Sequence, residues 1–279
     1  MMRNPIVAGQ FYEAFPDRLK QQIENCFNSS LGPGMPGKGE DKLLGVICPH
    51  AGYSFSGPCA AHSYKAIAES KKEDSYIILG ISHQGYPSCV SLKDWETPLG
   101  VVKNNIELTK ELMKNSGLKQ NEKAHAQEHS IEVQLPFLQY VDKDAKIVPI
   151  IVSEDIQYDD LAKAIVKTIQ GKNVKIIVSG DLTHYGINYG YMPFSDNIEK
   201  NLEKLDKGAI KFIENLDAHK FIEYVENKGA TICGKNPIAV ITSIAKILNA
   251  KVKLLKYYSS GEISKDYSSA VGYAAIEIR

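Results

Sequence analysis

Three short apolar runs in this chain are each followed closely by a histidine. The runs span residues 43–47, 76–81 and 174–178, and the histidines are His50, His83 and His184. Apolar runs of this length bounded by turn residues are typical of buried β-strands. In open α/β sheets, ligands bind outside the carboxyl ends of the strands. If the three strands are parallel neighbours, their ends share one edge of the sheet, and the sequence predicts a site shared by the three imidazoles.

The rest of the chain alternates between strand-like and helix-like segments. This alternation predicts a single α/β domain over residues 1–279, with a mixed, mostly parallel central sheet and helices on both faces. The expected helices include residues 16–30, 58–69, 158–170 and 238–248, and the expected closing strands are 252–258 and 270–278.

Composition places the chain among ordinary globular proteins. The 279 residues carry a formal net charge of zero, which gives no indication of a nucleic-acid or membrane partner. No apolar run is long enough to span a bilayer, and the first residues lack the apolar core of a signal peptide. Five cysteines without a C-x-x-C pair argue against a disulfide framework and predict a reducing, cytoplasmic location.

Several further residues have side chains suited to chemistry at this edge. Imidazole, carboxylate and thiolate groups are all ligands of first-row metals, but their spacing here matches no zinc-finger pattern. His125 and His129 are four residues apart, as on one helical face, yet the sequence between them is not that of a zincin. No G-x-S-x-G motif is present, which disfavours a serine hydrolase. The candidates are His50, His83, Glu128, His129, Asp181, His184 and Cys233.

Cys233 lies in a glycine-rich turn before a helix. We expect Asn236 to cap that helix and Pro237 to lie in its first turn. Helix amides at this position would favour the thiolate over the thiol, which suits a metal ligand. The alternative is a buried, inert cysteine. For Glu128, likewise, the alternative to a site role is a carboxylate that starts a helix.

Six short motifs together resemble the Memo family. Each is weak alone, but their order and spacing are specific, and they extend over nearly the whole chain. The motifs lie at residues 3–12 (R-N-P and A-G-Q-F-Y), 49–53 (P-H-A-G-Y), 80–83 (G-I-S-H), 128–132 (E-H-S-I-E), 179–186 (S-G-D-L-T-H-Y-G) and 231–234 (T-I-C-G).

The resemblance implies a fold similar to the LigB-like fold of the class III extradiol dioxygenases. Those enzymes hold a non-haem iron. The metal-binding positions of the Memo family match His50, His83 and Cys233, and the positions of Asp181 and His184 belong to the same pocket. The dioxygenases have a carboxylate where this chain has Cys233, which puts ring cleavage in doubt. A thiolate ligand suits copper or zinc as well as iron. Iron or copper is the expected metal, with zinc as the alternative.

These observations lead to one main functional hypothesis and two alternatives. The main hypothesis is a metal-dependent, dioxygenase-like redox enzyme of unknown substrate, with His184 as a base and Asp181, Glu128 and His129 as further catalytic residues. The first alternative is a non-catalytic module that binds a peptide or phosphopeptide through the positive potential of clustered histidines. The second is zinc-dependent hydrolysis. The resemblance also implies AMMECR-like and radical-SAM proteins as partners, and neither a nucleic acid nor a membrane is expected.

Overall fold

Four parallel strands form the centre of the fold. In the computed structural model, which describes residues 2–279, they lie in the order β1 (Gly45–Cys48), β8 (Val174–Ser179), β2 (Ser75–Gly80) and β7 (Lys146–Ile151). The pairing sets Cys48 beside Ser179 and Leu79 beside Val178. The strands that precede His50, His83 and Asp181 therefore end at the same edge.

Further strands extend the sheet on both sides. The C-terminal β11 (Ser269–Ile278) lies antiparallel to β1, and β10 (Val252–Ser259) lies outside it. A short strand, β9 (His184–Gly186), also pairs with β11 and leads into the 3-10 turn η1 (Ile187–Tyr189). The opposite side holds β3 (Cys89–Val90), β4 (Trp95–Thr97), β5 (Gly100–Asn104) and β6 (Lys119–Gln120).

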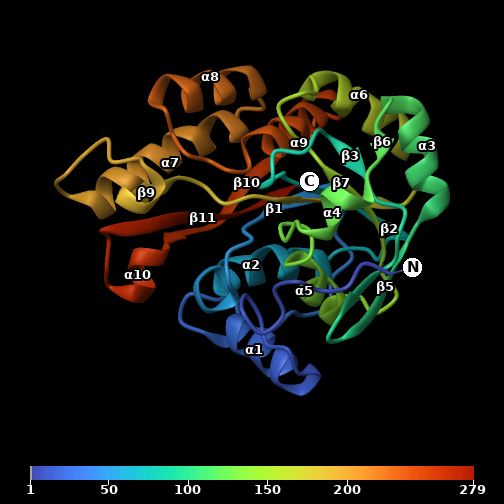
Figure 1. The fold of residues 1–279 in the computed structure, drawn as a ribbon, viewed down its shortest axis with the longest axis horizontal. Helices are drawn as coiled ribbons and strands as arrows, with labels where there is room; N and C mark the ends of the chain where they lie inside the picture. Colours follow the sequence, from blue (N-terminus) through green and yellow to red (C-terminus); the bar gives the residue numbers. More distant parts are fainter. Residues whose placement is uncertain (1) are drawn as a thin grey trace.

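Helices cover both faces of this sheet (Figure 1). One face holds α1 (Pro16–Asn28), α2 (Tyr53–Ala68) and α5 (Gln134–Val141). The other holds α3 (Ile106–Ser116), α6 (Tyr158–Ile169), α7 (Ile198–Glu214), α8 (Ala218–Lys228) and α9 (Lys235–Ile247). Two further helices, α4 (Glu122–Ala126) and α10 (Ser260–Ser264), are short.

The strand sequences explain why two cores form. Side chains of successive strand residues point to opposite faces. In β1, Val46 and Cys48 pack with α1, α2 and α5, whereas Ile47 packs with the helices of the other face. A strand buried on both faces reads as a continuous apolar run. The predicted fold class, a mixed α/β sheet with helices on both faces, is confirmed.

Two helix boundaries differ from the prediction. The helix expected at residues 58–69 begins at Tyr53, because Gly52 caps it and the Tyr53 N–H bonds to the Phe11 carbonyl. Pro58 therefore lies inside the helix and does not begin it. No helix begins at Glu128, which was the alternative for that residue, because residues 127–133 form turns and irregular structure and α5 begins at Gln134. Within residues 2–279, no helix is both long and apolar enough to cross a membrane.

Candidate metal centre

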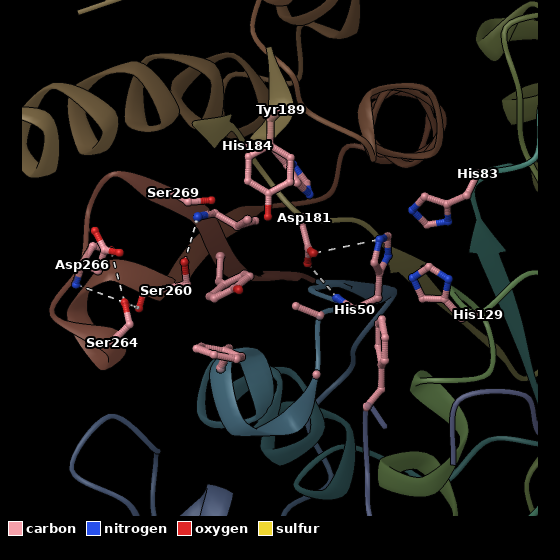
Figure 2. A pocket seen from close by; sticks show the side chains of 16 residues that line it. His50, His83, His129, Asp181, His184, Tyr189, Ser260, Ser264, Asp266 and Ser269 are labelled. Carbon is pink, nitrogen blue, oxygen red and sulfur yellow. Dashed lines mark hydrogen bonds and ion pairs between the residues drawn. The ribbon is translucent and has the colours of Figure 1, made fainter. Parts of the chain in front are cut away.

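Three imidazoles converge beyond the carboxyl ends of β1 and β2 (Figure 2). The ring centroids of His50 and His83 lie 5.3 Å apart, and those of His50 and His129 lie 5.6 Å apart. His83 and His129 stack at 4.3 Å. His184 lies on the wall of the same cavity. Strand ends supply His50 and His83, whereas His129 arrives from the turn before α5.

Hydrogen bonds fix the orientation and the tautomer of His50. Its backbone N–H donates to Asp181 Oδ1 at 2.8 Å, and its Nδ1 lies 3.0 Å from Ser179 Oγ. The Ser179 hydroxyl donates its only proton to the Ser130 carbonyl at 2.6 Å. Ser179 must therefore accept the proton of His50 Nδ1. The lone pair of His50 Nε2 is left free for another partner.

Glu128 fixes His83 in the same way. Its carboxylate accepts from the backbone N–H and from Nδ1 of His83, both at 2.8 Å. Burial favours the neutral acid, but the bonds from His83 and Ser130 outweigh it and lower the pKa of Glu128 to about 2. Because the carboxylate is ionised, His83 Nδ1 carries the proton and Nε2 has a free lone pair. Carboxylate–histidine pairs of this kind orient imidazoles that bind metals.

The donor atoms form two groups that share His50. In one, atoms of His50, His83 and His129 all lie within 4.8 Å of one another, and in the other, atoms of His50, Asp181 and Cys233 do so. Cys233 Sγ lies 3.4 Å from His50 Nε2 and accepts from the Asp181 N–H at 3.3 Å. Among the described residues, neither group contains both of the expected ligands His83 and Cys233.

A contact between two glycines brings Cys233 to this position. A Cβ atom on Gly180 would lie 2.7 Å from the Cα of Gly234, which is closer than real Cβ contacts. Only residues without side chains let the segment after β8 and the segment before α9 approach so closely. Cys233 is adjacent to Gly234, and Asp181 is adjacent to Gly180. The glycine contact therefore sets the distance between thiol and carboxyl.

The prediction for the helix after Cys233 was wrong in two details. Helix α9 begins at Lys235 with Gly234 as its N-cap, so Asn236 is not the cap, although Pro237 does lie in the first turn. The helix does not lower the pKa of the thiol. Burial and the neighbouring Asp181 carboxyl raise the pKa of Cys233 well above its usual value. A metal ion would therefore have to displace a proton from the sulfur.

Asp181 and His184 occupy different positions in the site. Asp181 bonds to both His50 and Cys233, and burial raises the pKa of its carboxyl. His184 Nδ1 lies 3.0 Å from the Leu182 carbonyl and 3.1 Å from that of Thr231. Both partners are acceptors, so Nδ1 carries the proton. His184 lines the cavity but belongs to neither group of candidate ligands.

Two cavities meet at His83. The first, of about 410 Å³, is lined by all the site histidines and Asp181, and the second, of about 580 Å³, is lined by Cys233 and the start of α9. His83 borders both. The candidate centre can therefore be approached from two directions.

Burial determines the charge of the cluster. It lowers the pKa of His50 to about 3, and burial together with the neighbouring His50 and His83 lowers the pKa of His129 to about 4. These two imidazoles are neutral near pH 7. The positive potential that the sequence suggested for clustered histidines is therefore not supplied by His50 or His129.

The buried charge network behind Glu128 was not predicted from the sequence. Arg3 is 4% exposed and pairs with Glu132, which is fully buried. Arg3 also donates to the Glu128 carbonyl at 2.6 Å, and Glu132 accepts from the Tyr12 hydroxyl at 2.6 Å. Glu128 and Glu132 both lie in the E-H-S-I-E motif, which was a usable signal, but their partners are 120 or more positions away.

His125 does not share a helical face with His129. It lies in α4, is fully buried beside Trp95, and neither of its ring nitrogens has a hydrogen-bond partner among the described residues. Residues 127–133 form turns and irregular structure, so the four-residue spacing of His125 and His129 does not place them on one helix. His125 is a buried core residue behind the centre.

Comparisons with known proteins agree with the motifs. A family model described as Memo-like protein matches residues 3–277. A MEMO1 family protein of Methanopyrus kandleri is 42% identical over 292 residues, which cover 100% of this chain and 99% of that protein. A MEMO1 family protein of Saccharolobus solfataricus is 43% identical over 290 residues, which cover 99% of this chain and 98% of that protein.

Proposed function

The chain belongs to the Memo-like protein family, and we propose that it binds a first-row transition metal ion for redox chemistry on a small molecule. The proposed ligands are His50, His83 and Cys233. In this proposal the fold is related to that of the class III extradiol dioxygenases, with a thiolate in place of their carboxylate ligand.

The observation that carries the proposal is the shared tautomer of His50 and His83. Each ring is held through Nδ1, by Ser179 and by Glu128, and each keeps Nε2 for another partner, which for His50 is Cys233 Sγ at 3.4 Å. Two fixed imidazole lone pairs beside a sulfur make a donor set suited to iron, copper or zinc. A structural histidine needs no such arrangement, since either nitrogen could satisfy its hydrogen bonds.

The residues around the ligands have separate proposed roles. Glu128 holds His83. The Asp181 carboxylate holds the backbone of His50, and the Asp181 N–H donates to Cys233 Sγ. His184 is held through Nδ1 at the cavity wall, and its Nε2 is proposed to accept a proton from a substrate. His129 stacks on His83 and forms the wall beside it. When bound, the metal would supply electron transfer and Lewis acidity.

Metal analysis of the protein purified without added metal tests the first half of the proposal. We expect iron or copper at one ion per chain, with an affinity that falls as pH falls because protons compete for the Cys233 sulfur. Cys233→Ser should weaken binding and flatten this pH dependence, whereas Cys89→Ser, at a buried cysteine outside the site, should change neither. Equal affinity and equal pH dependence in Cys233→Ser and the parent would contradict the ligand set.

Oxygen uptake tests the redox half. Iron- or copper-loaded protein should consume oxygen with a suitable reductant, and zinc-loaded protein should not. His184→Ala should keep the metal and lose turnover. A centre that takes only zinc and consumes no oxygen would overturn the redox proposal in favour of hydrolysis. The AMMECR-like and radical-SAM partners stay predictions.

A further inference from the structure

The first cavity has two chemically different ends. The imidazoles of His50, His83 and His129 lie at one end (Figure 2). Ser264, the last residue of α10, and Asp266, just after that helix, lie at the other end. A small molecule whose reacting end reaches the imidazoles would extend toward α10. The far end therefore determines which molecules fit.

The lining of this cavity offers no fixed positive charge. None of the described residues that line it is a lysine or an arginine, and it contains two carboxyl groups, those of Asp181 and Asp266. The Ser268 N–H donates to Asp266 Oδ1 at 2.8 Å, and hydrogen bonding from Ser268 lowers the pKa of this carboxyl, so it is ionised at neutral pH. An anionic group at this end would meet a carboxylate without a cation to balance it.

Aromatic rings also line this cavity. Phe55, Tyr189 and Tyr273 line it together with the serines of α10. Tyr189 also packs edge-on against His184, with ring centroids 5.0 Å apart. Aromatic faces attract ammonium groups through their quadrupole, and a nearby carboxylate adds to this attraction.

We propose that this cavity binds an organic cation, with an ammonium group at the α10 end against Asp266 and the aromatic rings. The opposite end of the ligand lies at the imidazoles, and in that respect the assignment rests on the proposed function. The proposed substrate class is an amine with an aromatic or aliphatic body. Molecules with a phosphate or carboxylate group at the α10 end are excluded.

Three probes with one aromatic body test the assignment by calorimetry. They are 2-phenylethylamine, 2-phenylethanol and 3-phenylpropanoate, measured on metal-free and on zinc-loaded protein. The amine should bind about tenfold more tightly than the alcohol, since ion-pair and cation–π attractions at exposed sites together have this size. The propanoate should bind more weakly than the alcohol to the metal-free protein.

Two variants locate the preference. Asp266→Asn should bring the affinity for the amine close to that for the alcohol. Tyr189→Leu should reduce the preference for the amine in part. Both side chains are at the surface, so neither change threatens folding. Asp160→Asn, at an exposed aspartate of α6, is the matched control and should leave the preference unchanged.

The outcomes separate this inference from the proposed function. If the propanoate binds metal-free protein as tightly as the amine, if the preference survives Asp266→Asn, or if none of the probes binds either form, the inference is wrong. Metal content is measured on the same samples. A protein that takes no metal but keeps an Asp266-dependent preference would contradict the proposed function and support the cation site.

Discussion

The two sides of the candidate centre are held in place by different physical means. The glutamate side comprises residues 81–83 and 125–132, and the aspartate side comprises residues 181–184 and 231–233. Each supplies one proposed ligand, His83 or Cys233, to the shared His50. Each is also supported by a buried carboxyl group, Glu128 or Asp206, but the pKa values of these two groups shift in opposite directions.

Buried ionised groups support the glutamate side. Glu128 has a pKa lowered to about 2 because it accepts from His83 and Ser130. Behind it, Glu132 pairs with Arg3 and accepts from the Val7 N–H and the Tyr12 hydroxyl. Every charge has a partner of opposite sign or several donors. Such networks are costly to break because the remaining charge is left buried.

A backbone bridge between Thr183 and Ile232 and hydrogen bonds to the Thr231 hydroxyl support the aspartate side. His184 N donates to Thr231 Oγ1 at 3.1 Å, and that hydroxyl donates back to the His184 carbonyl. Asp206 accepts from the Thr183 N–H and the Tyr257 hydroxyl, and burial raises its pKa to about 6. Among residues 2–279, no lysine or arginine forms an ion pair with Asp206. A buried carboxyl group can therefore hold a segment in place when hydrogen bonds favour its ionised form, as at Glu128, or when burial disfavours that form, as at Asp206.

The largest expected effect comes from breaking the charge network of the glutamate side. Glu132→Ala leaves Arg3 buried without its partner and should lower the free energy of unfolding by about 3–5 kcal/mol. Urea titration measures this. Glu111→Ala removes an exposed ion pair with Lys172 and should cost less than about 1 kcal/mol. A loss at Glu132 no larger than that at Glu111 would show that the network does not support the centre.

The next effect concerns acid and His125. Burial lowers the pKa of His125 to about 4, whereas the unfolded chain protonates it near 6.5. The unfolded state therefore binds more protons below pH 6.5, and stability falls as pH drops from 6.5 to about 4, by about 3 kcal/mol in total. His125→Leu should lack this loss, since its ring nitrogens have no partners to leave unsatisfied. Parallel stability profiles of parent and variant between pH 7 and 4 would refute the assignment.

A smaller effect is expected from the orienting carboxylate. Glu128→Gln keeps the size of the side chain but removes the charge that holds His83. We expect metal affinity to fall about 10–100-fold, as for other partners of metal-bound histidines. Chelator competition measures the affinity, and Glu122→Gln, in α4 outside the centre, serves as the control. An affinity unchanged by Glu128→Gln would mean that His83 is not a ligand.

The smallest effect at pH 7 should come from Asp206→Asn. The change removes a carboxyl group whose ionised form is disfavoured by burial, but it also weakens two hydrogen bonds. The net change in the free energy of unfolding should therefore be under about 1 kcal/mol. The pH dependence is more informative. The folded parent binds the proton more tightly than the unfolded chain, so the parent gains stability relative to the variant as pH falls from about 6 to 4. This sign is opposite to that for His125, and the same sign for both would refute the contrast between the two sides.

The sequence predicted the parts of the centre that depend on local pattern. The strand runs before His50 and His83 were found from their apolar residues, and their shared edge followed from the fold class. The start of α2 was missed, because Pro58 resembles a helix start whereas the true start depends on a hydrogen bond to Phe11. The cap of α9 was misplaced by two residues in favour of Asn236, because Asn is a preferred N-cap residue, whereas Gly234, which contacts Gly180, holds that position.

Other parts of the centre depend on contacts that no local pattern contains. The tautomer of His50 follows from a chain of bonds through Ser179 to Ser130, which are 49 positions apart. The pKa of Cys233 depends on burial and on Asp181, which outweigh the helix that the sequence suggested. Arg3 and Glu132 are 129 positions apart, and only the folded chain brings them together.

The contact between Gly180 and Gly234 also sets when the centre can form during synthesis. Cys233 is 183 positions after His50, and ribosomes add about 5–20 residues per second, so the thiol emerges roughly 10–40 s after the first imidazole. For most of that interval the growing chain has both imidazole donors but lacks the Cys233 sulfur. The complete centre forms only when the segment after α8 docks against Gly180, which makes it one of the last features of the nascent chain to assemble.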